Sequence, residues 1–381
     1  MHLSTSEIWP VGCHSAVFST ATRAVALLNG SAASIWELYA ERQDIGAVAE
    51  AVTRHWGLAA SDAIPMIAGL VDKWRTAGLI RIGPDTTAQK PAARPLDGID
   101  AGLYATHAGR FRLTCEDPAA AVVMAAVLAP LSAGPGSDAC ETRIDLHGFA
   151  NRYWTARDGI ALCSPGNISF ARHEVLKQLL IDPAVPDRCT AVLHAAAVRI
   201  ADHAVVSAGD CGRGKSTLTG CLVHDGAGYI GDDLLALDRD GRHIGVCPVA
   251  LSVKIGSWPV LAPLHLARLS SPEITINDYR LRYIDLSHRA PVEPRVPVGA
   301  IVFPNYMATA TFAAEAIEPE RSLQMLLDSG SRTAGDHPTM EGLCRLADQT
   351  PAWRLTYSDW RDAARFIGER LAAPAPNRAH R

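Results

Sequence analysis

The stretch HAVVSAGDCGRGKSTLTGCLV, residues 203–223, decides the fold of the larger part of this chain. Its first six residues form a short apolar run that predicts a β-strand. The next eight, GDCGRGKS, fit the pattern GxxxxGK[ST], and the residues from Thr217 onward predict a helix. A strand, a glycine-rich loop and a helix in this order are typical of a phosphate-binding loop.

The composition of this loop suits a nucleoside triphosphate and its magnesium ion. Glycines let successive backbone N–H groups converge on phosphate oxygens, and the helix N-terminus adds partial positive charge. Lys215 would reach the β- and γ-phosphates, and the Ser216 hydroxyl would bind Mg²⁺. We therefore expect ATP and Mg²⁺ as cofactors. The predicted nucleotide-binding residues are Gly209, Asp210, Cys211, Gly212, Arg213, Gly214, Lys215, Ser216 and Thr217.

Two adjacent aspartates, Asp232 and Asp233, follow in YIGDDLLAL (residues 229–237), which predicts one strand. Neighbouring side chains of a strand point to opposite faces, so one carboxylate would face the substrate and the other the metal. The separation from Lys215 allows one helix and a return strand, which would bring the pair beside the loop. An aspartate there can accept a proton from an attacking hydroxyl or hold Mg²⁺. The alternative is a pair that only holds the metal.

His194 lies just before the strand that enters the loop, in LHAAAV (residues 193–198). A histidine in such an apolar run is often a packed core residue. Beside a γ-phosphate it would instead donate a hydrogen bond or respond to the phosphate charge. Both readings stay open from the residues alone.

Composition excludes several classes of protein. The chain has 381 residues, of which 48% are hydrophobic and 20% charged, as expected of a globular protein with more than one domain. A net charge of −4 argues against nucleic-acid binding, which needs a basic face. We see no membrane-spanning run and no signal peptide. Nine cysteines without a CxxC pair disfavour disulfides and structural zinc. We expect a cytoplasmic protein that binds neither nucleic acid nor membrane.

The N-terminal part predicts a small, mostly helical unit. Residues 17–28 predict an extended hairpin, and three helices follow. Ser31 is the expected N-cap of the first helix, and Gly57 the residue that ends the second. Ser61 or Asp62 would cap the third.

The rest of the chain predicts an α/β domain after a proline-containing linker. Strands are expected at residues 143–146 and 152–156 around a turn at Gly148, and a helix at 168–180. Asp240 and Gly241 predict a hairpin turn into a strand at 243–246. The expected parts are a first domain at 1–82, a linker at 83–97, a catalytic domain at 98–371 and a flexible tail at 372–381.

Residues 191–258 resemble the HPr kinase/phosphorylase family, and more closely its diverged relatives in peptide-biosynthesis gene clusters. The matching pieces are LHAAAV (193–198), GDCGRGKST (209–217), YIGDD (229–233) and LSVKIGSW (251–258). The histidine, the phosphate loop and the aspartate pair occur in the order and spacing of that family. The resemblance implies a fold like phosphoenolpyruvate carboxykinase rather than an all-parallel P-loop fold.

The resemblance also implies roles for these residues. Asp232 would act as the base on a serine hydroxyl, while Asp233 and Ser216 would serve Mg²⁺. His194 would lie near the transferred phosphate, with Lys215 at the phosphates.

This chain departs from the family near residues 253–258. The family's regulators carry a metal-binding glutamate there, whereas this chain has Lys254 and no acid. The departure puts a second Mg²⁺ and the reverse phosphorylase reaction in doubt. Lys254 is a candidate phosphate contact instead. The family also has a later arginine, and Arg280 and Arg282 are the candidates for its position here. The alternative for each is a surface charge on a strand.

Residues 1–80 resemble PqqD, a small winged-helix domain that recognises leader peptides of ribosomally made, modified peptides. The matching pieces are LLNGSAASIWEL (27–38), DIGAVAEAV (44–52) and LVDKWRTAGLI (70–80). The family captures a leader as an added β-strand. Here the edge would lie within residues 16–28, with the third helix as the other wall of the groove. The alternative is a DNA-binding winged helix, but the third helix has no basic cluster.

Together the two resemblances imply a two-domain α/β (α+β) protein that acts on a tethered peptide. The leading hypothesis is a serine kinase of a ribosomally made precursor peptide, of the lasso-peptide type. The first alternative is an HPr-type serine kinase/phosphorylase acting on a carrier protein. The second is a non-catalytic, nucleotide-gated peptide chaperone. The related regulators are hexamers, so a homo-oligomer is a further expectation.

Overall fold

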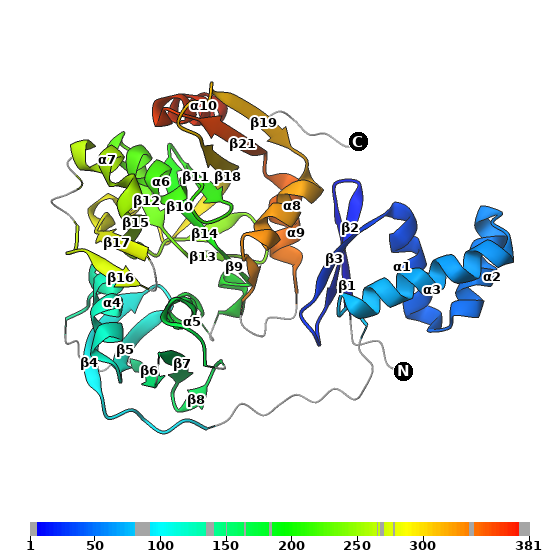
Figure 1. Cartoon of the computed structure of the whole chain (residues 1–381), viewed down its shortest axis with the longest axis horizontal. Helices are drawn as coiled ribbons and strands as arrows, with labels where there is room; N and C mark the ends of the chain where they lie inside the picture. The colour runs from blue at the N-terminus through cyan, green and yellow to red at the C-terminus, as the bar shows by residue number, and fades with distance from the viewer. Residues whose placement is uncertain are drawn as a thin grey trace.

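The computed structural model describes residues 6–80, 92–134, 141–149, 151–163, 165–182, 185–264, 266, 270–276, 279–334 and 339–372. Most of the expected linker and nearly all of the expected tail therefore lie outside the described residues. Within the described residues the strands form four sheets, and the helices cover them on several sides (Figure 1). No described helix is both long enough and apolar enough to cross a membrane.

The N-terminal part is an antiparallel sheet followed by three helices. The expected hairpin is confirmed, with an additional strand before it. The elements are β1 (Ser6–Val11), β2 (His14–Ser19), β3 (Val25–Asn29), α1 (Gly30–Arg42), α2 (Ile45–Trp56) and α3 (Ala60–Thr76).

The caps of these helices differ in part from expectation. Asn29, not Ser31, caps α1, because its side chain accepts a hydrogen bond from Ala32 N at 2.9 Å. Gly57 ends α2 in the left-handed conformation, as predicted. The third helix starts earlier than Ser61 or Asp62, and its N-cap Ala59 makes no side-chain hydrogen bond.

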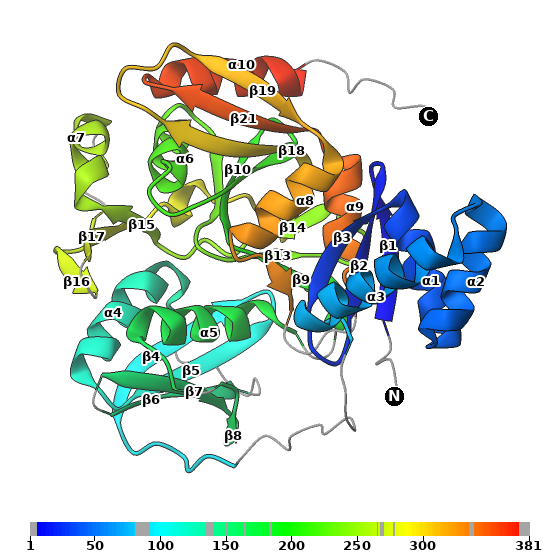
Figure 2. The same cartoon turned by 45° about the vertical axis from the view of Figure 1, so that its right-hand side comes forward.

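The N-terminal sheet has apolar contacts on both faces. One face packs on its own helices through residues such as Val17 and Trp74. The other packs on α8 (Pro319–Asp328) and α9 (Glu341–Gln349), where Phe18 joins the cluster that contains Leu323 and Leu343. Figures 1 and 2 both place the blue sheet beside these two helices. The N-terminal domain is therefore docked on the larger part through buried side chains.

A five-stranded sheet with two helices forms the next layer, at the bottom of Figure 1. Its elements are β4 (Ile99–Thr106), β5 (Gly109–Cys115), α4 (Pro118–Leu128), β6 (Glu141–Phe149), β7 (Arg152–Arg157), β8 (Ile160–Ala161) and α5 (Ile168–Leu180). The predicted helix at 168–180 is confirmed. Gly148 is not in the turn, because it pairs with Tyr153 inside the ladder.

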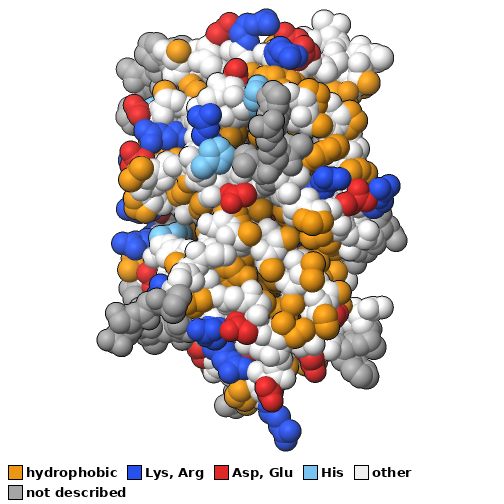
Figure 3. Space-filling model, turned by 90° about the vertical axis from the view of Figure 1, so that its left-hand side faces the viewer, with side chains coloured by type: hydrophobic (Ala, Val, Ile, Leu, Met, Phe, Trp, Pro, Cys, Tyr) orange, Lys and Arg blue, Asp and Glu red, His pale blue; other side chains and the backbone are white. Residues whose placement is uncertain are grey.

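Helix α4 is apolar on all sides, since its sequence is PAAAVVMAAVL. It buries Met124 and Val127 against the five-stranded sheet, yet Val122 is 60% exposed. Figure 3 looks onto the side of the molecule that carries α4, and hydrophobic side chains gather in the lower half of that view.

The largest sheet carries the glycine-rich loop of residues 209–214. Its main path runs β12-β10-β11-β18-β14-β13-β9-β20, and β21 and β19 continue from β18. Pairing of β11 with β18 is parallel, whereas β10 with β11 is antiparallel, so the sheet is mixed rather than all-parallel. The strands are β9 (Ala191–Leu193), β10 (Ala195–Ile200), β11 (His203–Ala208), β12 (Gly228–Gly231), β13 (Leu235–Leu237), β14 (His243–Gly245), β18 (Arg295–Tyr306), β19 (Ala313–Ile317), β20 (Arg332–Thr333) and β21 (Ala352–Tyr357).

The segment from 229 to 237 is not one strand. It divides into β12 and β13, and the two aspartates occupy the break between them. Asp233 has φ +66°, a conformation that no continuous strand contains. The predicted turn at Gly241 is confirmed, with φ +66° between β13 and β14.

A small sheet and four helical elements complete the surroundings of the loop. The sheet has the order β15-β17-β16, with β15 at Leu251–Lys254, β16 at Ile274–Ile276 and β17 at Tyr279–Ile284. The helical elements are α6 (Lys215–His224), η3 (Ile255–Ser257), α7 (Trp258–Leu261) and α10 (Trp360–Ala372). Helix α6 starts at the loop and packs between β10 and β15.

Candidate functional site

The loop between β11 and α6 has the backbone that a phosphate-binding loop needs. Gly209, Gly212 and Gly214 have φ values of +123°, +85° and +99°. Only glycine adopts such angles without strain, which explains why these three positions are glycines. Gly214 also faces Tyr357, whose hydroxyl would lie 3.1 Å from a Cβ at that position. The loop is anchored on β18, since Tyr306 N donates to Arg213 O.

Asp232 lies next to the start of α6. Ser216 Oγ donates toward its two carboxylate oxygens, at 3.3 and 3.5 Å. Ser252 N, on β15, donates to Asp232 Oδ2 at 3.0 Å. The side chain is buried, and burial together with the charge of Asp233 raises its pKa to about 7. The hydroxyl of Ser216, from α6, and the carboxylate of Asp232, from the segment after β12, therefore meet at one point of the cavity.

Asp233 faces a different set of groups. Its carboxylate forms a 2.8 Å ion pair with Arg172, on α5. Arg172 is buried and also donates to the Tyr283 hydroxyl at 3.0 Å. Burial would raise the pKa of Asp233, but Arg172 and then His173 and His194 outweigh it and hold that pKa below its usual range. Asp233 is therefore ionised at neutral pH.

Two histidines complete this side of the site. His194 Nδ1 donates to the Ser329 carbonyl at 2.6 Å, because a carbonyl can only accept. Its Nε2 is thus the nitrogen free to act toward the cavity. The rings of His173 and His194 are 5.4 Å apart, and ligand atoms of both lie within 4.8 Å of Asp233. Burial lowers the pKa of His173 to about 4, so His173 is neutral.

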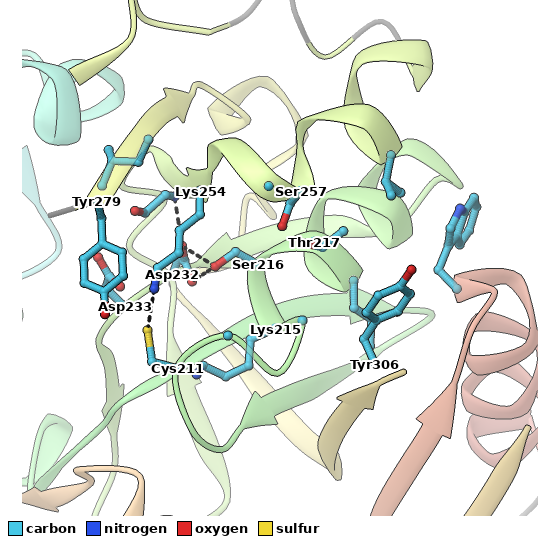
Figure 4. A pocket seen from close by; sticks show the side chains of 18 of the residues that line it. Cys211, Lys215, Ser216, Thr217, Asp232, Asp233, Lys254, Ser257, Tyr279 and Tyr306 are labelled. Atoms are coloured by element: carbon cyan, nitrogen blue, oxygen red, sulfur yellow. Dashed lines mark hydrogen bonds between the residues drawn. The ribbon is translucent and has the colours of Figure 1, made fainter. Parts of the chain in front are cut away.

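Both lysines of the cavity contact the phosphate loop. Lys215 Nζ donates to the carbonyls of Gly209 and Asp210 at 2.5 and 3.0 Å. Lys254 Nζ lies 3.0 Å from Cys211 Sγ and 3.6 Å from the centre of the Tyr279 ring. Figure 4 shows both ammonium groups at the loop, with Lys254 on the side of the aspartates. Each could reach a phosphate bound in the loop after a side-chain rotation.

These groups line one cavity of about 900 Å³. One end holds the aspartates and histidines. The other is aromatic, with Tyr306, Tyr357 and Trp360, and Figure 4 shows Tyr306 on the side opposite the two aspartates. Among the described residues, the arginines proposed from sequence do not line this cavity. Arg282 stacks over Trp258 at 4.8 Å, and Arg280 pairs with Glu273 at 2.5 Å on the surface.

Several residues of the site carry no sequence signal of their own. Arg172 and His173 lie on a helix that periodicity identifies, but nothing in that pattern relates them to the loop. They belong to a run of three polar residues with Glu174, in a helix that also contains Lys177 and Gln178, so their polarity does not single them out. Ser252 and the three aromatic residues are brought in by strands and a helix far along the chain.

Comparisons with known proteins concern the two parts separately. Residues 16–80 match the family described as Coenzyme PQQ synthesis protein D (PqqD), and this confirms the resemblance of the N-terminal part. No curated protein matches the chain. A solved structure, the Hpr(Ser) kinase/phosphatase from Coxiella burnetii, is similar at 14% identity and a TM-score of 0.23, over 47% of this chain and 93% of that one. A likeness of that size carries no argument about activity. The PqqD match covers β2 to α3, and so assigns a family to the N-terminal domain alone.

Proposed function

We propose that this chain is an ATP- and Mg²⁺-dependent kinase that phosphorylates a serine hydroxyl of a ribosomally made precursor peptide, of the lasso-peptide type. The N-terminal domain would hold the leader of that peptide. The observation that carries the proposal is the composition of one cavity. A phosphate loop, a serine and carboxylate pair, and a second carboxylate beside two histidines all line it.

The residues fit a magnesium ion. Mg²⁺ prefers oxygen ligands in octahedral geometry and keeps several waters. Ser216 Oγ and Asp232 Oδ2 are 3.3 Å apart, close to the ~3 Å that separates neighbouring ligands of an octahedral Mg²⁺ site. Ser216 and Asp232 would therefore hold the ion, which would neutralise charge on the β- and γ-phosphates.

This geometry favours the opposite division of roles from the one that the resemblance implies. Asp232 is beside Ser216, so it suits the metal better than Asp233 does. Asp233 is ionised and lies beside His194, away from Ser216, which leaves it in position to accept the serine proton. The assignment rests on this position, because a lowered pKa makes Asp233 a weaker base than a group that titrates near 7. We assign Asp233 as the general base, positioned by Arg172, and His194 Nε2 as a group beside the transferred phosphate.

The loop and its lysines would stabilise the negative charge of the nucleotide. Lys215 now donates to two loop carbonyls, and a bound phosphate would replace these acceptors. Lys254 is a candidate second phosphate contact from β15. The aromatic end of the cavity suits the base of the nucleotide, because flat rings stack on Tyr306 or Trp360.

The leader would bind as an added strand at β3. Within the described residues the sheet order is β1-β2-β3, so β3 is an edge strand and has one unpaired side. The residue before β3 lies beside the segment that follows α3, since a Cβ at Gly78 would be 3.4 Å from the Cβ of Ala24. Holding the leader there would raise the local concentration of the acceptor serine at the cavity.

The test is intact-mass spectrometry of the precursor peptide encoded beside the gene for this chain, after incubation with the full chain, Mg²⁺ and ATP. We expect a mass increase of one phosphoryl group. Asp233→Asn should lose transfer while retaining nucleotide binding, and Asp232→Asn should lose Mg²⁺-dependent nucleotide binding. Asp225→Asn, at the exposed end of α6, is the matched control and should transfer normally.

Two results would overturn the proposal. The first is unmodified peptide although nucleotide is bound, which would leave a carrier-protein kinase or a nucleotide-gated chaperone. The second is equal phosphorylation of the peptide with and without its leader, which would remove the role of the N-terminal domain. Transfer retained by Asp233→Asn but lost by Asp232→Asn would restore the division of roles that the resemblance implies.

A further inference from the structure

A cysteine, a histidine and a glutamate meet where the N-terminal sheet docks on α8. Cys13 and His14 lie at the turn between β1 and β2, and Glu320 is in the first turn of α8. Cys13 Sγ lies 3.2 Å from His14 Nδ1 and 3.3 Å from Glu320 Oε1, and His14 Nδ1 lies 3.8 Å from the same oxygen. These three atoms form a small triangle at the junction of two parts of the chain.

The dimensions of this triangle match a zinc site. Tetrahedral Zn²⁺ with bonds of roughly 2.0–2.3 Å to nitrogen, oxygen and sulfur holds its ligand atoms about 3.3–3.5 Å apart. Each observed separation is within about half an ångström of that range, so an ion could enter with small side-chain rotations. A thiolate and an imidazole favour Zn²⁺ over Mg²⁺ or Ca²⁺, which prefer oxygen ligands.

The backbone around the triangle keeps the glutamate close. Gly12 has φ +57°, and a Cβ at this position would collide with Glu320 Oε2. Gly12 N also donates to Asp348 Oδ1, on α9, at 3.1 Å. The turn is therefore fixed on both docking helices, and the absence of a side chain at Gly12 gives the Glu320 carboxylate its place beside Cys13.

We propose that Cys13, His14 and Glu320 bind Zn²⁺ and that the ion fastens the N-terminal domain to α8. Three protein ligands leave a fourth position for water. Cys13 and Glu320 are separated by 307 positions, so the bound ion would link the domain that carries the PqqD match to the part that carries the phosphate loop. The proposal stands independently of the proposed kinase activity.

A zinc site of this kind can exist in a chain that has no CxxC pair. Sequence patterns for zinc use two or more ligands at short, fixed spacings in each half of the site. Here Cys13 and His14 are adjacent, and the third ligand comes from a helix at the other end of the chain. Only the docking of the sheet on α8 brings the three groups together.

The test is metal binding by the purified, reduced full chain. Co²⁺ in place of Zn²⁺ should give the sulfur-to-cobalt charge-transfer absorption that requires a thiolate ligand. This absorption separates the site from the group formed by His173, His194 and Asp233, which contains no sulfur. Cys13→Ser should lose the absorption. The control Cys211→Ser, which changes the other exposed cysteine of the described residues, should retain it.

A competition titration of Zn²⁺ against a coloured chelator measures how much Glu320, the ligand from α8, contributes to Zn²⁺ affinity. Glu320→Gln should weaken Zn²⁺ binding at least tenfold, roughly the smallest effect reported for groups that merely support a metal ligand. Asp328→Asn, at the exposed far end of α8, is the matched control and should bind as the parent does. A parent chain without thiolate absorption, or Glu320→Gln with unchanged affinity, would overturn the proposal.

Discussion

At the scale of single residues, the pKa values of two adjacent carboxylates are shifted in opposite directions. Asp232 is buried with few compensating charges, which raises its pKa to about 7. Asp233 is held ionised by Arg172, although burial acts in the other direction. Such a difference between neighbouring groups separates their chemical roles. It arises because Asp232 turns toward α6 and Asp233 toward α5.

The raised pKa of Asp232 predicts a pH dependence of nucleotide binding. Mg²⁺ needs the ionised carboxylate, so protons compete with it as the pH falls through 7. Affinity for Mg²⁺–ATP should therefore fall from pH 8 to pH 6. In the metal-free chain the sign for stability is opposite. An acid with a raised folded-state pKa costs stability as pH rises from about 4 through 7.

Calorimetric titration of Mg²⁺–ATP at pH 6, 7 and 8 would measure this dependence. The control is Asp232→Asn, which should bind weakly and without this pH dependence. An affinity of the parent that is constant over the range would contradict the raised pKa.

The ion pair between Arg172 and Asp233 predicts a large effect on stability. Arg172→Met leaves a carboxylate that is only 18% exposed without its partner and should lower the free energy of unfolding by up to about 3–5 kcal/mol. Chemical denaturation would measure it. Arg365→Met breaks the exposed pair with Asp362 and should change stability by less than about 1 kcal/mol. Equal effects of the two substitutions would contradict a larger contribution of the Arg172–Asp233 pair to stability.

At the scale of elements, two interruptions of regular structure build the site. The break between β12 and β13 releases both aspartates from the alternation of a strand, and the glycine loop turns β11 into α6. The break lies beside the loop because β12 pairs with β10, which in turn pairs with β11. Functional side chains thus come from the ends of strands rather than from their middles.

Two glycines at the two ends of α6 allow an effect on stability to be distinguished from an effect on nucleotide binding. Gly214→Ala and Gly226→Ala both place alanine at a φ near +100°, and each should cost on the order of 1–3 kcal/mol. A Cβ at Gly226 meets no atom within 4 Å, whereas one at Gly214 meets Tyr357 and Tyr306. Only Gly214→Ala should therefore also lose nucleotide binding. Thermal unfolding with and without Mg²⁺–ATP would distinguish the two variants.

At the scale of the whole molecule, the docked sheet lies close to the histidine of the site. Arg23, in the β2–β3 turn, donates to Thr333 Oγ1 on β20. Two residues earlier, Ser331 Oγ accepts from His194 N at 3.2 Å, and Ser329 O accepts from its ring. A short segment therefore contacts the N-terminal domain at one end and holds His194 at the other.

The buried contact between the N-terminal sheet and helices α8 and α9 should contribute to the free energy of unfolding. Phe18 is buried in the cluster with Leu323 and Leu343, so Phe18→Ala should lower the free energy of unfolding by about 3–5 kcal/mol. Val292→Ala removes a side chain that is 98% exposed and should have an effect within about 0.5 kcal/mol. Limited proteolysis should also cut Phe18→Ala between the domains sooner. A Phe18→Ala chain as stable as Val292→Ala would contradict the packing described.

Local patterns in the sequence predicted what depends on neighbouring residues. The glycine-rich loop with its flanking strand and helix, the helix at 168–180 and the end of α2 at Gly57 follow from spacing, glycine and periodicity. The same local reasoning was wrong for the strand at 229–237. Apolar residues on both sides of the aspartates suggest continuity, whereas Asp233 takes a left-handed conformation and forms an ion pair with Arg172 on a distant helix.

The sequence by itself determined that this chain has a glycine-rich loop between a strand and a helix, an adjacent acidic pair and an N-terminal sheet with three helices, because each is encoded within a short stretch. The tertiary structure alone decided which aspartate meets Ser216 and which meets Arg172, and it alone joined Cys13 to Glu320. Those contacts join residues far apart along the chain. Their formation depends on how sheets and helices pack, and no local pattern of residues specifies that packing.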